Sequence, residues 1–292
     1  MKIRKALITC AGFGTRFLPI SKAVQKEMLP ILNRPIIDYI VQDCILAGIT
    51  EIIFVVKENE SQLVQQYYSD SKLLKQHLTK MGKLEKLAQA ESASENISFI
   101  FVTQTANDKY GTAVPVELGK EYLQDEDAFL VFMGDDFIFN PGTIAAKEMI
   151  QLFEESQSEA LVTCIRKPES ELHRYGVAET KTQHGYTYLT NLVEKPQPGT
   201  APSNLTNISK YIFTPKIFEL LKTQAPDASS GEYYITDTAT QLAQTNPVVI
   251  YTPSGKYLDG GTVLGWLKAN LIVAKQDPEL QAALIEFITE EF

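Results

Sequence analysis

Short apolar runs alternate with amphipathic segments along the first half of the chain. The runs show almost no polar face, which is typical of strands buried on both sides of a sheet. They lie at residues 6–9, 51–56, 97–102 and 129–133. Helices are predicted between and after them, at residues 36–45, 112–123 and 143–156. Strands that alternate with helices predict an α/β fold, here a Rossmann-like open sheet, mainly parallel but mixed, flanked by helices.

Two later segments depart from this alternation. Residues 61–95 are largely polar, with apolar side chains at helical spacing, which predicts an inserted pair of amphipathic helices. The apolar positions are Leu74, Leu78, Met81, Leu84 and Leu87. Residues 175–180 and 186–193 flank a polar turn at Gly185, which predicts a hairpin that covers a site.

The length of the chain indicates its domain organisation, and its charge argues against two classes of binding surface. With 292 residues, the chain is long enough for one large domain and an appendage. We therefore assign residues 1–255 to an α/β domain, and residues 256–292 to a C-terminal helical extension that completes the site and is a candidate oligomer interface. Acidic residues outnumber basic ones, 36 against 27, and the formal net charge is -9. This balance argues against a nucleic-acid-binding or anionic-membrane surface.

Cysteine usage and hydropathy predict a cytoplasmic protein. Three scattered cysteines, Cys10, Cys44 and Cys164, are too few for a disulfide framework or a tetrahedral metal site. The first apolar run ends after three residues and glycines follow, so we expect a strand there and not a signal peptide. The longest apolar stretch, about six residues at 128–133, is far below the ~18 residues needed to span a bilayer.

A glycine-rich loop follows the first predicted strand and carries the clearest chemistry. Gly12 and Gly14 would let backbone N–H groups approach phosphate oxygens, and Arg16 and Lys26 would supply positive charge for a triphosphate. Two glycines after a strand are equally compatible with a plain tight turn. The loop lacks the Gly-Lys-Ser/Thr of a Walker A loop. It is no dinucleotide fingerprint either, because Phe17 stands at the position of the third glycine.

The residues that follow this loop establish a family resemblance. Gly12-Phe13-Gly14-Thr15-Arg16 is followed by Pro19 and by Lys22 to Pro30, in which Lys26-Glu27-Met28-Leu29-Pro30 stands out. This order resembles the sugar-nucleotide pyrophosphorylases, over nearly the whole chain, and favours their uridylyltransferase branch. The resemblance implies the nucleotide-diphospho-sugar transferase fold and transfer of a uridylyl group from UTP to glucose 1-phosphate, giving UDP-glucose and pyrophosphate. It also implies in-line attack without a covalent intermediate, and a homo-oligomer, either dimer or tetramer.

The resemblance assigns roles to individual residues. It implies that the loop holds the nucleotide phosphates, that Arg16 and Lys26 act in catalysis, and that Gln104 and Gly111 read the base. The nucleotide-binding set is Ala11, Gly12, Gly14, Thr15, Gln104, Gly111 and Thr112. An amide side chain matches the imide of uracil and of thymine alike, so Gln104 leaves thymidylyl transfer open as an alternative.

Two carboxylates are candidate magnesium ligands. Asp135 follows the apolar run at 129–133, at the end of a strand where open parallel sheets bind ligands. The resemblance makes Asp135 and Asp259 the metal ligands and counts Asp135 among the catalytic residues. Mg²⁺ is the cation that such oxygen ligands and substrate phosphates suit. The Gly134-Asp135-Asp136 sequence is also common turn chemistry, and we regard Asp136 as a turn residue more than as a ligand.

The sugar side of the site is expected after the predicted hairpin. The resemblance implies that Glu194 binds sugar hydroxyls, that Lys195 binds the sugar phosphate and acts in catalysis, and that Gly176 and Asn204 make further sugar contacts. Without that context, Glu194 and Lys195 would be read as an exposed salt-bridging pair.

Three positions depart from the family pattern. Gln25 replaces a usual proline, Ser209 replaces a common glycine, and Thr262-Val263 replaces an Asn-Lys pair, which removes a positive charge near the phosphates. These changes leave two further alternatives to uridylyl transfer: cytidylyl transfer to a sugar 1-phosphate, and a catalytically weak paralogue that binds a sugar nucleotide as a regulator. A nicotinamide-dependent oxidoreductase is disfavoured, since the second strand ends at Val56-Lys57 without the acidic residue that would bind the ribose.

Overall fold

A single large sheet forms the centre of the molecule. The computed structural model describes residues 2–58, 61–69, 71–83, 85–86 and 97–291. Its nine-stranded sheet runs, in spatial order, β5 (Ser98–Gln104), β4 (Glu51–Lys57), β1 (Lys5–Cys10), β6 (Phe129–Met133), β11 (Leu205–Phe213), β8 (Ala160–Arg166), β12 (Val248–Tyr251), β10 (Tyr186–Glu194) and β9 (Gly176–Gln183).

The sheet is parallel in its N-terminal half and mixed beyond it. β5, β4, β1 and β6 pair in parallel, which confirms the prediction from their apolar runs. β11 is antiparallel to both β6 and β8, while β12 pairs in parallel with β8. The hairpin predicted around Gly185 is present as β9 and β10, at one edge of the sheet. The open, mixed α/β fold is therefore confirmed.

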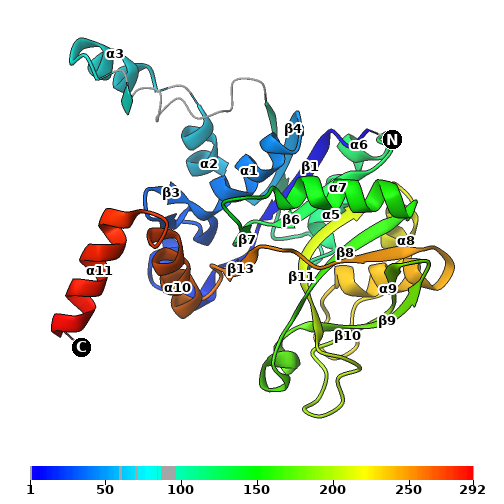
Figure 1. The fold of residues 1–292 in the computed structure, drawn as a ribbon. Helices are drawn as coiled ribbons and strands as arrows, with labels where there is room; N and C mark the ends of the chain where they lie inside the picture. The colour runs from blue at the N-terminus through cyan, green and yellow to red at the C-terminus, as the bar shows by residue number, and fades with distance from the viewer. Residues whose placement is uncertain (1, 59–60, 70, 84, 87–96, 292) are drawn as a thin grey trace.

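Helices cover both faces of the sheet (Figure 1). α1 (Ile36–Leu46) and α7 (Ala145–Ser156) pack on one face, where Ile8 of β1 points. The other face, where Leu7 points, is covered by α5 (Val114–Leu118), α6 (Lys120–Leu123), α8 (Ile217–Thr223) and α9 (Ile235–Thr245). Alternate side chains of one strand thus enter two separate cores, which is why the strand shows no polar face.

Within its described residues, the predicted insertion includes α2 (Ser61–Tyr68) and α3 (Lys72–Lys80). Tyr68 anchors α2, because its ring lies 5.8 Å from that of Phe54 and 4.6 Å from that of Phe99. α3 extends away from the sheet (Figure 1). Of the predicted apolar positions, Leu84 and Leu87 fall outside the described residues.

The C-terminal segment begins inside the body of the fold. β13 (Lys256–Asp259) pairs antiparallel with β7 (Asp136–Phe139), so a strand and not a linker follows residue 255. α10 (Val263–Ala274) and α11 (Pro278–Glu291) come next, as predicted for this end of the chain. Trp266 of α10 donates a hydrogen bond through Nε1 to the carbonyl of Pro30, 2.9 Å away. This bond ties α10 to the small hairpin of β2 (Pro30–Ile31) and β3 (Arg34–Pro35).

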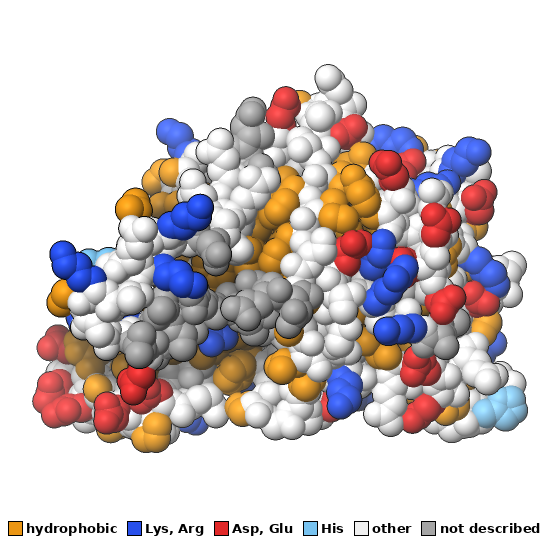
Figure 2. Space-filling model, turned by 90° about the horizontal axis from the view of Figure 1, so that it is seen from above, with side chains coloured by type: hydrophobic (Ala, Val, Ile, Leu, Met, Phe, Trp, Pro, Cys, Tyr) orange, Lys and Arg blue, Asp and Glu red, His pale blue; other side chains and the backbone are white. Residues whose placement is uncertain are grey.

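Charged side chains of both signs are mixed on one face of the molecule. Acidic and basic side chains are both scattered over the face drawn in Figure 2, with hydrophobic side chains between them. No helix in the described part of the chain combines the length and apolar character that a membrane crossing requires.

Candidate active site

A pocket opens at the carboxyl ends of β1, β5 and β6. It measures about 160 Å³ and gathers seven of the residues predicted from the sequence: Ala11, Gly12, Lys26, Gln104, Gly111, Thr112 and Asp135. Thr9, Glu27, Tyr110, Pro115, Met133 and Glu232 complete its lining. A second pocket of about 390 Å³ adjoins it through Ala11, Gln104 and Tyr110. The crevice therefore lies at the edge where open α/β sheets bind ligands.

The glycine-rich loop needs its glycines for two different reasons. Gly14 has a φ of 60°, in the left-handed region that glycine adopts without strain. Gly12 has Lys26 beside it, and a Cβ on Gly12 would lie 3.3 Å from the Lys26 Cε. Thr15 and Arg16 follow in a short 3-10 turn, η1 (Thr15–Phe17), and both are exposed. The loop thus leaves Arg16 accessible to an anion.

Lys26 and Asp135 form an ion pair in the centre of the pocket. The Lys26 ammonium donates a hydrogen bond to Asp135 Oδ2. Burial alone would suppress ionisation of both groups, but the attraction between the two opposite charges is larger than this effect. This attraction raises the pKa of Lys26, together with a contribution from Glu27, and lowers the pKa of Asp135. Both side chains are therefore charged at neutral pH.

Asp259 faces the same small space as Asp135. A Cβ placed on Gly261 would lie 2.5 Å from Asp135 Oδ2 and 3.1 Å from Asp259 Oδ1, so the lack of a side chain at residue 261 leaves room between the carboxylates. Within the described ranges, no group of three or more His, Cys, Asp or Glu side chains is arranged to hold a metal ion. Two carboxylates that approach one another beside Gly261 fit Mg²⁺, which takes its remaining oxygen ligands from phosphates and water.

The predicted base-reading residues lie at the rim of the pocket. Gln104 ends β5, and its Nε2 lies 3.4 Å from the carbonyl of Lys109. Gly111 has a φ of 134°, and a Cβ there would collide with the backbone of Tyr233, so glycine is required for close packing. Thr112 accepts a hydrogen bond through Oγ1 from the Ile235 N–H, 3.0 Å away, at the start of α9. Thr112 therefore connects the pocket to the start of α9.

Three of the predicted sugar-side residues come together. A Cβ on Gly176 would lie 2.9 Å from Glu194 Oε2, which shows how closely the two residues pack. Burial raises the pKa of Glu194, and its Oε2 accepts a hydrogen bond from Thr236 Oγ1 at 3.2 Å. Lys195 has a φ of 43°, a strained conformation for a non-glycine residue of the kind found at functional sites. Its Nζ lies 3.4 Å from the Tyr234 hydroxyl.

Asn204 is not part of this group. Its Oδ1 accepts a hydrogen bond from Arg166 Nη1 at 2.6 Å, at the exposed start of β11. Asn207, three residues further along β11, instead lies beside Gly176, with its Cβ 3.9 Å from the Cβ position of that glycine. Sugar binding by Asn204 thus stays a prediction. In this structure, Asn207 is the asparagine that lies beside Gly176.

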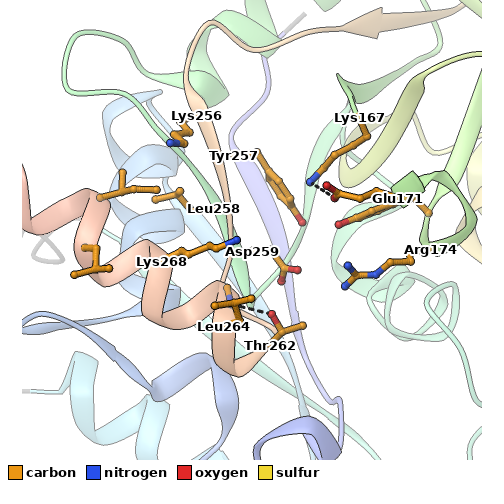
Figure 3. Close-up of a pocket in the computed structure, with 14 residues that line it drawn as sticks. Lys167, Glu171, Arg174, Lys256, Tyr257, Leu258, Asp259, Thr262, Leu264 and Lys268 are labelled. Atoms are coloured by element: carbon orange, nitrogen blue, oxygen red, sulfur yellow. Dashed lines mark hydrogen bonds and ion pairs between the residues drawn. The ribbon is translucent and has the colours of Figure 1, made fainter. Parts of the chain in front are cut away.

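A larger pocket lies on the far side of Asp259 (Figure 3). It measures about 750 Å³ and lies between η4 (Glu169–Arg174), β13 and α10. Four basic side chains line it, Lys167, Arg174, Lys256 and Lys268, against two carboxylates, Glu171 and Asp259. Figure 3 shows Arg174 and Lys268 reaching toward Asp259 from opposite walls. Although the protein as a whole is acidic, this pocket is therefore lined mainly by basic side chains, next to the candidate metal ligand Asp259.

Sequence reasoning missed Lys210 and Tyr257. Both contact Asp136, the carboxylate beside Asp135. The sequence did contain one indication of the role of Lys210. It is the only charged residue of β11, and a lysine buried in a strand needs an acidic partner or hydrogen-bond acceptors. No pattern in the sequence identified that partner, because Asp136 lies 74 residues away.

The three departures from the family pattern have local structural settings. Gln25 is 6% exposed and has a φ of -56°, which a proline would also adopt. Ser209 has a φ of 54°, which explains why glycine is common there. Thr262 accepts a hydrogen bond through Oγ1 from the Gly265 N–H at 3.0 Å and so caps α10, while Val263 is exposed.

Comparison with known proteins agrees with this geometry. Residues 5–276 match the nucleotidyl transferase family. The chain is 37% identical over 288 residues to UTP–glucose-1-phosphate uridylyltransferase of Bacillus subtilis (strain 168), covering 98% of this chain and 96% of that protein. A UTP-bound UGPase from Acinetobacter baumannii superposes with a TM-score of 0.88 at 30% identity, covering 100% of both chains. A UDP-glucose pyrophosphorylase complexed with UDP-glucose gives 0.84 at 30% identity, covering 94% of this chain and 100% of that chain.

Proposed function

The chain belongs to the nucleotidyl transferase family, and from this premise we propose that it transfers a uridylyl group from UTP to glucose 1-phosphate, forming UDP-glucose and pyrophosphate. The convergence of Lys26, Asp135 and Asp259 at the open end of the sheet is the observation that carries the proposal. The relatives named for UTP, glucose 1-phosphate and UDP-glucose support the choice of substrates.

Lys26 and Arg16 would neutralise the triphosphate. UTP carries several negative charges, and an oxygen nucleophile approaches its α-phosphorus only when that charge is offset. Lys26 is held in the pocket, and the exposed Arg16 lies ten residues before it on the same loop. In-line attack by a sugar-phosphate oxygen would then expel pyrophosphate without a covalent enzyme intermediate, because alignment and charge stabilisation suffice for such transfers.

Asp135 and Asp259 would hold Mg²⁺. When bound there, it would supply positive charge that offsets the negative charge developing during transfer. The carboxylates face one another across the space left by Gly261, which suits a shared ligand. Asp135 is ionised because Lys26 lowers its pKa despite burial, so it needs no deprotonation before it binds a cation.

The sugar phosphate would be bound by Lys195 and the sugar by Glu194. Tyr234 and Glu194 raise the pKa of Lys195 although partial burial opposes its charged form, so the ammonium keeps its charge for a phosphate. The Glu194 carboxylate packs against Gly176, at the base of the β9–β10 hairpin. A carboxylate in this position accepts hydrogen bonds from sugar hydroxyls.

Two properties of the whole protein belong to the same proposal. We place it in the cytoplasm, a location supported by Cys10, Cys44 and Cys164, which are free and buried. We also expect a homo-oligomer, a dimer or a tetramer, supported by exposed apolar side chains on the C-terminal helices, among them Leu264, Leu267, Ile285 and Phe287. Light scattering of the purified protein would measure the mass in solution, and a monomer would contradict that expectation.

The test is pyrophosphate release by purified protein with Mg²⁺ and glucose 1-phosphate. UTP, dTTP, CTP, ATP and GTP are supplied separately, and we expect rapid release with UTP. A preference for dTTP or CTP would move the protein to thymidylyl or cytidylyl transfer. Folded protein that binds UDP-glucose but releases no pyrophosphate with any nucleotide would be a regulatory paralogue and not an enzyme.

A further inference from the structure

Two side chains from different strands, Lys210 and Tyr257, meet at Asp136, which is next to Asp135 in the chain and opposite Asp259. Lys210 of β11 is 2% exposed and Asp136 of β7 is 7% exposed. The Lys210 ammonium donates to Asp136 Oδ1 and, at 3.0 Å, to the Asp136 backbone carbonyl. The Tyr257 hydroxyl of β13 donates to Asp136 Oδ2 at 2.8 Å. Both carboxylate oxygens of Asp136 are therefore engaged by protein groups, which makes it unsuited to bind a cation.

A bulge in β11 directs Lys210 toward this point. The pairing of β11 with β8 shifts register between Asn207 and Tyr211. Within the bulge, Ser209 takes a left-handed φ of 54°, and its N–H donates to Asn207 Oδ1 at 2.9 Å. Lys210 then stands opposite Phe132 of β6, with its ammonium 5.5 Å from the ring centroid. Its side chain thus runs along β6 to the residues that follow that strand.

Asp136 is connected to both candidate ligands through the backbone. It directly follows Asp135 in the chain, and it stands opposite Asp259 in the β7–β13 pair. The carbonyl of Asp135 accepts a hydrogen bond from the Gly260 N–H at 2.9 Å, one residue after Asp259. Tyr257 lies two residues before Asp259, on the same face of β13. A shift of Asp136 would therefore move Asp135 and Asp259 relative to one another.

We propose that Lys210 is a positioning residue for the reaction: by holding Asp136 together with Tyr257, it fixes Asp135 and Asp259 at the separation that a divalent cation requires. The proposal rests on the proposed function in so far as Asp135 and Asp259 are the metal ligands. A buried ion pair adds little net stability over apolar side chains, so we attribute to the Lys210–Asp136 pair the fixing of a geometry. When a residue that holds a metal ligand in place is lost, metal affinity typically falls by about 10–100-fold.

The experiment measures divalent-cation binding apart from turnover. Mn²⁺ is titrated into protein saturated with UDP-glucose, free Mn²⁺ is followed by electron paramagnetic resonance, and thermal unfolding is recorded for each variant. Lys210→Met removes the ammonium and leaves Asp136 unpaired, so it is accompanied by the double variant Lys210→Met/Asp136→Asn, which removes both buried charges and keeps an acceptor for Tyr257. Lys210→Arg tests rescue by a second cation. Lys216→Met is the matched control, since Lys216 pairs with Glu159 far from the site.

The expected result is a Kd for Mn²⁺ raised about tenfold or more in the double variant, with a matching rise in the Mg²⁺ concentration needed for turnover. Lys210→Arg and Lys216→Met should bind Mn²⁺ within about twofold of the unchanged protein, well below the effect of about 10–100-fold expected when a supporting group is lost. A double variant that folds and binds Mn²⁺ as tightly as the unchanged protein would overturn the proposal. So would an unchanged protein that binds no Mn²⁺. If the unchanged protein binds Mn²⁺ yet releases no pyrophosphate, the proposed function fails, and the Mn²⁺ affinity of the double variant alone then decides the positioning role.

Discussion

The Lys26 ammonium is hydrogen-bonded to Asp135 Oδ2, the same oxygen that faces the open space beside Gly261. The two residues are 109 positions apart in the chain. The lysine expected to bind phosphate and the carboxylate expected to bind Mg²⁺ therefore neutralise each other when no substrate is present. Binding of a triphosphate would draw Lys26 away and leave Asp135 free for the cation.

This pairing predicts opposite effects of Lys26→Met on metal binding and on catalysis. Without nucleotide, Mn²⁺ should bind the variant more tightly than the unchanged protein, because no ammonium competes for Asp135. Turnover should fall by about 10²–10³-fold, the usual effect of removing one group that stabilises the transition state. Calorimetry and pyrophosphate release measure the two effects, with the exposed Lys147→Met as control. Weaker Mn²⁺ binding by Lys26→Met would contradict the competition between lysine and cation.

Gly261→Ala should weaken metal binding. The added Cβ would lie 2.5 Å from Asp135 Oδ2 and would push that carboxylate out of the shared space. We expect Mn²⁺ affinity to fall about tenfold or more, the range seen when groups around a metal site are disturbed. Gly142→Ala is the matched control, because a Cβ there meets nothing nearer than 3.7 Å. Equal Mn²⁺ affinity in both variants would show that the space beside Gly261 is not the metal site.

The parallel half of the fold could be predicted from the sequence because its strands are buried on both faces. β1, β4 and β6 consist of almost continuous apolar runs, and that pattern survives without knowledge of their neighbours. β11 could not be identified in the same way, since Asn207, Ser209 and Lys210 interrupt its apolar residues for reasons that lie elsewhere in the molecule. β7 and β13 have only four residues each, and they are recognisable as strands only through their pairing with one another.

The site was predictable as a set of residues but not as a set of contacts. Resemblance placed Gly12, Lys26 and Asp135 in one site, and the structure brings them into one pocket. The pairing of Lys26 with Asp135 could not be read from their order in the chain, because it depends on the loop after β1 folding back over the end of β6. The position of Asn204 against Arg166 likewise depends on where the bulge in β11 falls.

Gln25→Met should stabilise the protein. Gln25 is almost fully buried, and among the described residues neither atom of its amide has a hydrogen-bond partner. A methionine of similar shape removes that cost, so the free energy of unfolding should rise by about 1 kcal/mol and Tm by about 2–4 °C. Urea and thermal unfolding measure both, with Gln25→Glu as the opposing control, because a buried carboxylate should destabilise. A loss of stability in Gln25→Met would mean that an ordered water satisfies the amide.

The backbone conformation of Ser209 predicts that a glycine variant is more stable, and a valine variant less stable, than the unchanged protein. Its φ of 54° costs a residue with a side chain about 1–2 kcal/mol relative to glycine, partly offset by the greater freedom of glycine in the unfolded chain. Ser209→Gly should therefore raise the free energy of unfolding by up to about 1 kcal/mol, whereas the β-branched Ser209→Val should lower it by about 1–2 kcal/mol. Urea unfolding at constant pH gives both values. A valine variant as stable as the glycine variant would exclude a left-handed Ser209.

The central claim is that an oxygen of the sugar phosphate attacks the α-phosphorus of UTP in this site, and isotope tracing tests it most directly. Glucose 1-phosphate labelled with ¹⁸O at its phosphate oxygens is incubated with UTP, Mg²⁺ and the protein, and the products are analysed by mass spectrometry. UDP-glucose should retain all of the label, and pyrophosphate should carry none. Labelled inorganic phosphate or pyrophosphate, or the absence of UDP-glucose, would contradict it.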